Sequence, residues 1–176
     1  GLTFASANAV TFGNAATDQV NLQAANVNIT TTGAGAAGAL TFNSLVDGRF
    51  DLVLTTSGAT QFDQNVGSGT SIGDGTGAAI TINSTGATNV NGTLQTFSGI
   101  ASVNGAGAIT FTENVTIAAG DTATTLINAV TNLSGLTFQS AGNVTFGNAA
   151  GADQVNLQAA NVNITTTGTG ALTFTS

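Results

Sequence analysis

The chain repeats a three-residue pattern in which an apolar residue, a Thr or Asn, and a second apolar residue follow one another. This alternation of β-branched or aromatic with polar residues predicts strands with one buried and one solvent-facing side. Clusters rich in Gly, Ala, Asn and Ser separate the triplets, as in 31–39 and 67–77, and they predict turns. The triplets lie at 2–4, 10–12, 20–22, 27–29, 40–42, 80–82, 109–111, 115–117, 136–138, 144–146, 155–157, 162–164 and 172–174.

The spacing of every second triplet predicts a coil. Leu2 and Val20 are 18 residues apart, Val10 and Val27 are 17 apart, and Val20 and Leu40 are 20 apart. Coils of about 17–20 residues with two clear strands, and a shorter third, are typical of a β-solenoid. We therefore predict an all-β fold in which 1–176 is a single continuous β-solenoid segment.

Stacked coils would place the triplet residues in ladders at a strand spacing of about 4.8 Å. The middle residues Thr3, Thr11, Asn21 and Asn28 are expected to face outward. Like charges opposed at this spacing repel, which accounts for the scarcity of charged residues in the triplets. The residues expected to face inward are Leu2, Phe4, Val10, Phe12, Val20, Leu22, Val27 and Ile29.

The triplets also form part of a much longer repeat. The fifteen residues QVNLQAANVNITTTG at 19–33 recur unchanged at 154–168, and the wider match joins 1–42 to 135–174. We take 1–134 as one full tandem unit and 135–176 as the start of the next. Seven coils would fill a unit and return the solenoid to the same face. An array of β-sandwich domains is the rival architecture, and the absence of Trp, Tyr and Pro disfavours it.

Composition narrows the function. The chain has no Cys, His, Pro, Met, Trp, Tyr or Lys, its single cation is Arg49, and its net charge is −7. Nucleic-acid binding needs Lys or Arg to displace counterions, so no nucleic-acid partner is expected. No apolar run reaches the roughly 20 residues that span a bilayer, so no membrane insertion is expected. A hydrophobic content of 41% with ten Phe residues argues for a packed core rather than disorder.

Only carboxylates remain as candidates for acid–base or metal chemistry. They are Asp18, Asp47, Asp51, Asp63, Asp74, Glu113, Asp121 and Asp153. The Gly-rich stretch 67–77, which contains Asp74 and follows Asp63, suggests calcium. One Asp per loop is too few ligands, however, and turn chemistry is preferred. Asp47, Arg49 and Asp51 could form a carboxylate–guanidinium cluster, for which a surface ion pair or a turn at Asp47-Gly48 is preferred.

Other functions receive little support. A polysaccharide lyase or hydrolase would need paired carboxylates, usually with a cation, and only the Asp47/Arg49/Asp51 group approaches this. Ice binding would need T-x-T in the same place on successive coils, whereas here Thr and Asn mix. The sequons at Asn28, Asn91, Asn114 and Asn143 follow from the composition. We expect no enzyme activity, catalytic residue, cofactor or metal.

Two stretches carry a family resemblance. They are AGNVTFGNAAGADQVNLQAANVNITTTGTGALTF at 141–174 and ALTFNSLVDGRFDLVLTTSGATQFDQNVGSG at 39–69. Both resemble the repeat regions of giant bacterial surface proteins of the filamentous haemagglutinin-like adhesin type. The resemblance implies a right-handed parallel β-helix shaft, export to the bacterial cell surface, and a role in adhesion or cell–cell contact. Expected partners are neighbouring repeats, end-to-end copies, and a cell-surface or glycan ligand.

Overall fold

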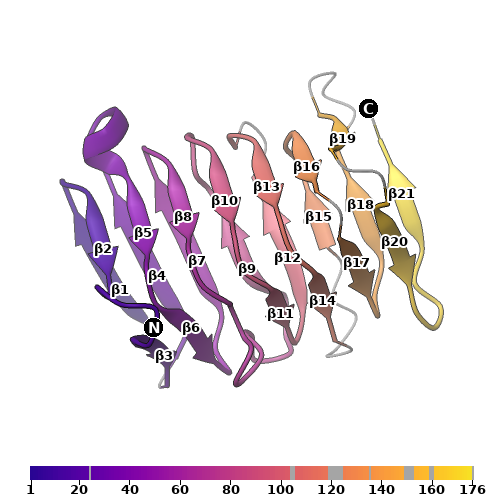
Figure 1. Ribbon diagram of the computed structural model, residues 1–176, viewed down its shortest axis with the longest axis horizontal. Helices are drawn as coiled ribbons and strands as arrows, with labels where there is room; N and C mark the ends of the chain where they lie inside the picture. The colour runs from indigo at the N-terminus through magenta and orange to yellow at the C-terminus, as the bar shows by residue number, and fades with distance from the viewer. Residues whose placement is uncertain are drawn as a thin grey trace.

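The chain forms a β-solenoid, as predicted. The computed structural model describes residues 1–23, 25–103, 106–118, 125–134, 136–148, 153–158 and 161–175. All strand pairing among them is parallel, and the strands stack in three sheets that run along the molecule. The coils follow one another in a row, with the N-terminus at one end and the C-terminus at the other (Figure 1).

The strands lie on three faces, and each complete coil other than the third contributes one strand to each face. Sheet A contains β1 (Leu2–Ser6), β4 (Val27–Thr31), β7 (Leu52–Thr56), β9 (Ala78–Ile82), β12 (Gly99–Ser102), β15 (Thr125–Ile127), β18 (Val144–Phe146) and β21 (Leu172–Phe174). Sheet B contains β2 (Val10–Phe12), β5 (Leu40–Phe42), β8 (Thr60–Phe62), β10 (Thr88–Val90), β13 (Ile109–Phe111), β16 (Thr131–Leu133) and β19 (Val155–Leu157). Sheet C contains β3 (Gln19–Leu22), β6 (Leu45–Gly48), β11 (Leu94–Thr96), β14 (Val115–Ile117), β17 (Thr137–Ser140) and β20 (Asn163–Thr166). A short 3₁₀ helix, η1 (Gly35–Gly38), precedes β5.

The predicted coil length of 17–20 residues is too short for five of the seven turns along sheet A. Along sheet A, successive register partners are 25, 25, 28, 20, 25, 19 and 28 residues apart. Leu2 pairs with Val27 rather than stacking on Val20, because Val20 belongs to β3, the third strand of the same turn. The sequence spacing counted two triplets per coil where the solenoid uses three.

The predicted return to the same face after seven coils is also wrong. Five turns separate β1 from β15 along sheet A. The copy of β1 is β17, which comes two strands later, after β16 on sheet B, and lies on sheet C. The repeat unit therefore spans five turns and two faces. The segment 19–33 starts on sheet C and ends on sheet A, whereas its copy 154–168 starts on sheet B and ends on sheet C.

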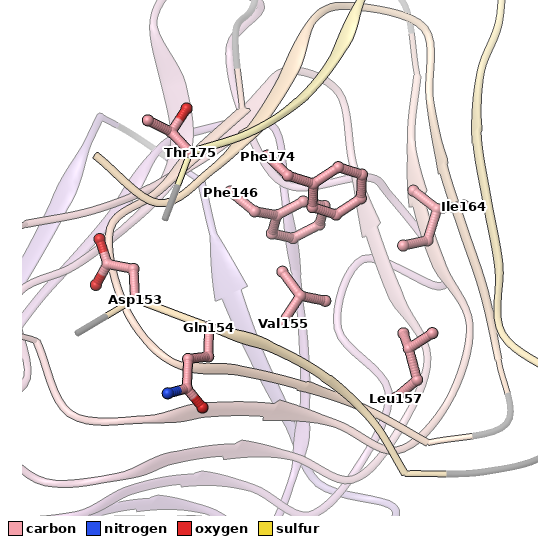
Figure 2. A pocket seen from close by; sticks show the side chains of 8 residues that line it. All are labelled: Phe146, Asp153, Gln154, Val155, Leu157, Ile164, Phe174 and Thr175. Carbon is pink, nitrogen blue, oxygen red and sulfur yellow. The ribbon is translucent and has the colours of Figure 1, made fainter. Parts of the chain in front are cut away.

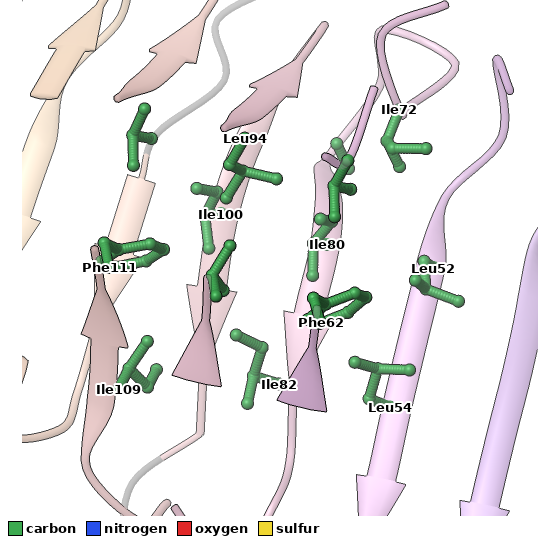
Figure 3. Close-up of a cluster of buried hydrophobic side chains, with 14 of the residues drawn as sticks. Leu52, Leu54, Phe62, Ile72, Ile80, Ile82, Leu94, Ile100, Ile109 and Phe111 are labelled. Atoms are coloured by element: carbon green, nitrogen blue, oxygen red, sulfur yellow. The ribbon is translucent and has the colours of Figure 1, made fainter. Parts of the chain in front are cut away.

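The core is a set of apolar ladders enclosed by the three sheets. Leu52 and Leu54 of β7 are in register with Ile80 and Ile82 of β9, and all four side chains are buried. Figure 3 shows such residues at matching heights on neighbouring coils. On sheet B, Phe42 stacks on Phe12 and on Phe62, with ring centroids 5.2 and 4.7 Å apart. Full burial of each such side chain contributes about 1.5–3 kcal/mol.

The triplet pattern missed several strands because Thr, rather than an apolar residue, occupies their first inward-facing position. Thr60, Thr88 and Thr131 start β8, β10 and β16, and all three are fully buried on sheet B. At the corner between sheets A and B the hydroxyl of Thr60 lies 2.8 Å from that of Thr56 and 2.9 Å from that of Ser84. A buried hydroxyl is tolerated where another hydroxyl satisfies it, so the corner accepts polar residues that the pattern assigned to solvent.

The inward assignment holds where another coil covers the strand. Leu22, Val27 and Ile29 are buried, but Leu2 is 63% exposed and Phe4 is 41% exposed. Both lie in the first coil, which has a neighbour on one side only (Figure 1). Burial in this fold thus depends on the adjacent coil as well as on which way the side chain points.

Candidate functional site

Sheet C is interrupted once, in the third coil, where a loop replaces a strand. Val66 and Ile72 continue the face as single bridges, Val66 between Val46 and Leu94 and Ile72 to Thr96. Both side chains are fully buried, so the core is continuous beneath the loop. The residues between them, 67–71, leave the face as a Gly-rich loop. The prediction of a turn-like segment over 67–77 is confirmed, with Ile72 as an anchor within it.

The buried carboxylate of Asp47 holds this loop in place. Its Oδ1 accepts hydrogen bonds from the backbone N–H groups of Gly69 at 2.9 Å and Thr70 at 3.2 Å. Its Oδ2 accepts a third from the side-chain amide of Gln19 at 2.7 Å. A carboxylate that is only 2% exposed requires such partners, because an unsatisfied buried charge is strongly unfavourable.

Asp51 and Asp74 fix the other side of the loop. Oδ1 of Asp51 accepts the backbone N–H of Asp74 at 3.2 Å, and Oδ2 accepts the side-chain amide of Asn26 at 3.0 Å. Desolvation by burial raises the pKa of Asp51 above its ordinary value, since it disfavours the charged form. Hydrogen bonds from the hydroxyl and the backbone N–H of Thr76 lower the pKa of the exposed Asp74.

Both expectations for the VDGRFD segment, a surface ion pair or a turn at Asp47-Gly48, are wrong. Asp47 and Gly48 end strand β6, in register with Asn21 and Leu22. Asp47 and Asp51 direct their oxygens to backbone and amide donors instead of to the cation. Arg49 is exposed, and its guanidinium forms no ion pair or hydrogen bond with any residue that the structure describes.

Arg49 lines a hollow of about 370 Å³ beside the loop. The aromatic ring of Phe97, which is 42% exposed, forms another wall. Polar groups from the loop complete the lining, namely Thr70, Ser71 and Asp74 with the backbone at Gly69 and Gly73. We refer to this hollow, lined by Arg49, Gly69, Thr70, Ser71, Gly73, Asp74 and Phe97, as the loop pocket. It combines one free cation, one apolar ring and several hydrogen-bonding groups.

Asp63 and Asp74, the calcium candidates, serve separate local structures. Oδ1 of Asp63 accepts the side-chain amides of Gln61 and Asn91, and Oδ1 of Asp74 accepts the two groups of Thr76. Over the described parts of the chain, no three acidic, His or Cys residues gather as a metal site would require. Asp121 lies outside the described residues.

The outward rows have the polar character that the pattern predicted, with exceptions on sheet A. On sheet B, the amide of Asn132 donates to the hydroxyl of Thr110 at 3.1 Å, and the amide of Asn156 donates to Oδ1 of Asn132 at 3.0 Å. Sheet A instead places Val53, Ala101 and Leu126 in its outward row. A regular T-x-T face is absent from these described rows, which disfavours ice binding.

Two of the sequon residues have structural roles. Oδ1 of Asn114 accepts the backbone N–H of Thr137 at 3.0 Å, and Oδ1 of Asn143 accepts that of Ala171 at 2.8 Å. Asn65, which is not a sequon, does the same for Thr93 at 3.0 Å. In each case an Asn at a corner satisfies a donor of the next coil. The sequence signal for this role was an Asn shortly before a strand, which was attributed to composition.

Both ends of the solenoid expose apolar core. The hollow at the C-terminal end, about 250 Å³, is lined by Phe146, Val155, Leu157, Ile164 and Phe174, with Asp153, Gln154 and Thr175 at its edge (Figure 2). At the N-terminal end, a hollow of about 130 Å³ includes Leu2, Phe4, Phe12, Val20 and Leu22. These hollows are the open ends of the core ladders, where another coil would pack.

Comparison with known proteins returns no match, whether to protein-family models, to curated proteins or to solved structures. Within the described residues, no helix has the length and apolar character needed to cross a bilayer.

Proposed function

We propose that the chain is a structural shaft segment of an extracellular filamentous adhesin or fibre at the bacterial cell surface. The observation that carries this proposal is the continuity of the structure. Sheets A and B and one apolar core run from the first coil to the last, and the bridges of Val66 and Ile72 carry the third face across its one interruption. Both ends expose strand edges and core side chains. Length in such a structure grows by adding coils, and stability is approximately a sum of coil and interface terms.

The unit of five turns and two faces adds a feature that suits a multivalent fibre. Further copies of the unit would each advance about 27 Å along the axis at the strand spacing of a sheet. Each would also be turned by one face relative to the previous copy. Three units would return to the starting face, so every side of the shaft would present the same surface groups. Attachment then results from many weak contacts along the fibre.

Imaging of tandem chains tests the shaft. Chains with one, two and four units should appear as rods of constant width whose length rises by about 27 Å per unit. Display of the same series on a bacterial surface should increase cell attachment with unit number. Beads joined by thin linkers would contradict the shaft, and attachment that is independent of unit number would contradict the adhesive role.

A self-assembling filament subunit is the second candidate, and the open ends favour it. Exposed strand edges are templates for further parallel pairing. Strand β21 at one end and β1 at the other share the triplet Leu-Thr-Phe, so a second copy could continue sheet A with like residues in register. Sedimentation over a range of concentrations should show end-to-end association. A chain that remains monomeric at high concentration would eliminate this candidate.

A further inference from the structure

We propose that the loop pocket binds a sugar residue that carries a single carboxylate, such as a uronic acid within a surface glycan. This inference rests on the attachment function proposed above and gives it a ligand class. The pocket does not itself depend on surface location, so the two ideas can fail separately.

The free cation is the first reason. Arg49 is the only cationic side chain in a sequence of net charge −7, and two carboxylates lie within two residues of it. Both turn to other donors: Asp47 to the backbone of the loop and to Gln19, and Asp51 to Asp74 N–H and Asn26. A guanidinium left unpaired in this setting presents its planar fork of N–H groups to a carboxylate from outside.

The aromatic ring is the second reason. Phe97 is 42% exposed although it follows β11, and the backbone of Gly75 lies against its ring. A side chain at Gly75 would approach the ring to 2.9 Å, and its φ of +97° favours glycine, so this close packing depends on the missing side chain. Phe97 also lines the loop pocket, where its ring would offer an apolar platform to the C–H face of a sugar ring.

The polar lining selects a hydroxylated ligand. Asp74 uses Oδ1 for Thr76 and has Oδ2 available as an acceptor for sugar hydroxyls. Ser71 and Thr70 add hydroxyls from the loop. The negative charge of the whole chain opposes a densely charged polyanion, since like charges repel over the surface. A sugar with one carboxylate would direct that group to Arg49 and its hydroxyls to the carboxylate of Asp74.

The loop is held well enough to serve as a binding wall. Asp47 anchors Gly69 and Thr70 from below, and Gly73 N–H donates to the carbonyl of Phe50 at 3.2 Å. The pocket is partly open to solvent, so one site should bind weakly. Repetition of the unit along a fibre would multiply such weak sites into useful avidity.

Amide chemical shifts of the isotopically labelled 176-residue chain test the proposal. D-glucuronate should shift the amides of Gly69, Thr70, Ser71, Asp74 and Phe97. D-glucose, which lacks the carboxylate, and acetate, which lacks the ring, should each bind at least about tenfold more weakly. Arg49→Gln and Phe97→Ala should each weaken glucuronate binding by a similar factor.

Matched controls separate the pocket from general effects. Asn8→Asp changes the net charge by the same amount as Arg49→Gln at an exposed turn of the first coil, and Leu126→Ala truncates an exposed apolar residue on sheet A. Both should bind glucuronate as the parent does. Absence of glucuronate shifts, equal shifts with acetate, or unchanged binding in Arg49→Gln would overturn the proposal. Rod length in imaging should be the same for Arg49→Gln, so loss of binding leaves the test of the shaft intact.

Discussion

The two copies of the repeat have closely similar sequences but occupy different places in the solenoid. Residues 10–22 run from sheet B to sheet C, whereas their copy at 144–157 runs from sheet A to sheet B. The local structure is nevertheless repeated. Gly13 and Gly147 both have positive φ, at 79° and 85°. Asp18 and Asp153 both accept a backbone N–H of the turn, from Asn14 and Asn148 respectively.

This comparison separates what the local sequence determines from what neighbouring coils determine. Strand and turn conformations recur because they depend on residues close together in the chain. The face on which a segment lies is set by the number of strand positions that precede it. One unit fills seventeen such positions, five turns of three plus two more. Seventeen is not a multiple of three, so the next copy begins on a different face. Burial is set by whether a coil lies on each side. The three corners must therefore be similar enough for one turn sequence to serve at different corners.

The largest predicted contrast is between Phe138 and Phe4, which occupy the same place in the two copies. Phe138 is fully buried, whereas Phe4 is 41% exposed in the first coil. Phe138→Asp should lower the free energy of unfolding by at least about 4 kcal/mol, because it removes an aromatic side chain from the core and buries a charge. Phe4→Asp should cost less than about 1 kcal/mol. Urea denaturation measures both, and similar losses would contradict the assigned coil positions.

The next contrast lies within the fifteen identical residues, and here the residue of the first copy is the buried one. Leu22 is 4% exposed, while its copy Leu157 is 61% exposed beside the open C-terminal end. Leu22→Ala should destabilise the chain by about 2–5 kcal/mol through loss of apolar contact and a residual cavity. Leu157→Ala should have less than about 1 kcal/mol of effect. A larger loss at Leu157 would show that copy 154–168 is covered by further structure.

A third prediction concerns the turn glycine with positive φ that both copies share. Gly13→Ala and Gly147→Ala should each cost about 1–2 kcal/mol or more, because left-handed backbone is unfavourable for residues with a side chain. An added Cβ would also come within 2.7 Å of Ser44 Cβ at the first site and 1.9 Å of the Thr175 carbonyl oxygen at the second. Thermal unfolding of both variants gives the comparison. A loss at only one site would mean that the turn differs between the copies.

The smallest predicted effect tests the carboxylate of the same turn. Oδ2 of Asp18 accepts the N–H groups of Asn14 at 2.8 Å and Ala15 at 3.1 Å, and Oδ2 of Asp153 accepts that of Asn148 at 3.0 Å. Asp18→Ala and Asp153→Ala should each destabilise by about 1 kcal/mol, since partly exposed hydrogen bonds are modest in net energy. Asn variants should recover part of the loss, and no recovery would argue against the hydrogen-bonding role.

The sequence was sufficient to predict the solenoid and most inward residues, but the predicted length of a coil was too short for most turns. Period-2 alternation identifies a strand wherever both inward positions are apolar, as in Leu40–Phe42. It fails at β8, β10 and β16, where a buried Thr occupies one inward position. The hydroxyl of Thr60 has partners in Thr56 and Ser84, which is a tertiary contact, whereas that of Thr88 has no partner among the described residues. The coil length failed for a different reason: the first turn contains three recognised triplets, at 2–4, 10–12 and 20–22, and the spacing was taken between every second one.

The loop pocket could be predicted only in part. Composition identified Arg49 as the single cation and the VDGRFD segment as a cluster. Which donors Asp47 and Asp51 would choose depends on residues 22–28 positions away along the chain, such as Gly69, Gln19 and Asn26. Phe97 joins the pocket from the following coil, and no local signal in the sequence links it to Arg49.

Cysteine cross-linking tests the central claim, that the second copy lies on different faces from the first. The chain has no Cys of its own, so engineered pairs report without background. Leu126 and Thr145 are register partners on sheet A, close enough for a disulfide once both are Cys, and the pair Asn132/Asn156 on sheet B serves as a positive control. The account predicts that Leu126→Cys/Thr145→Cys cross-links, whereas Asn132→Cys/Thr145→Cys does not. The reverse result would place Thr145 on sheet B, where its copy Thr11 lies, and would contradict the account.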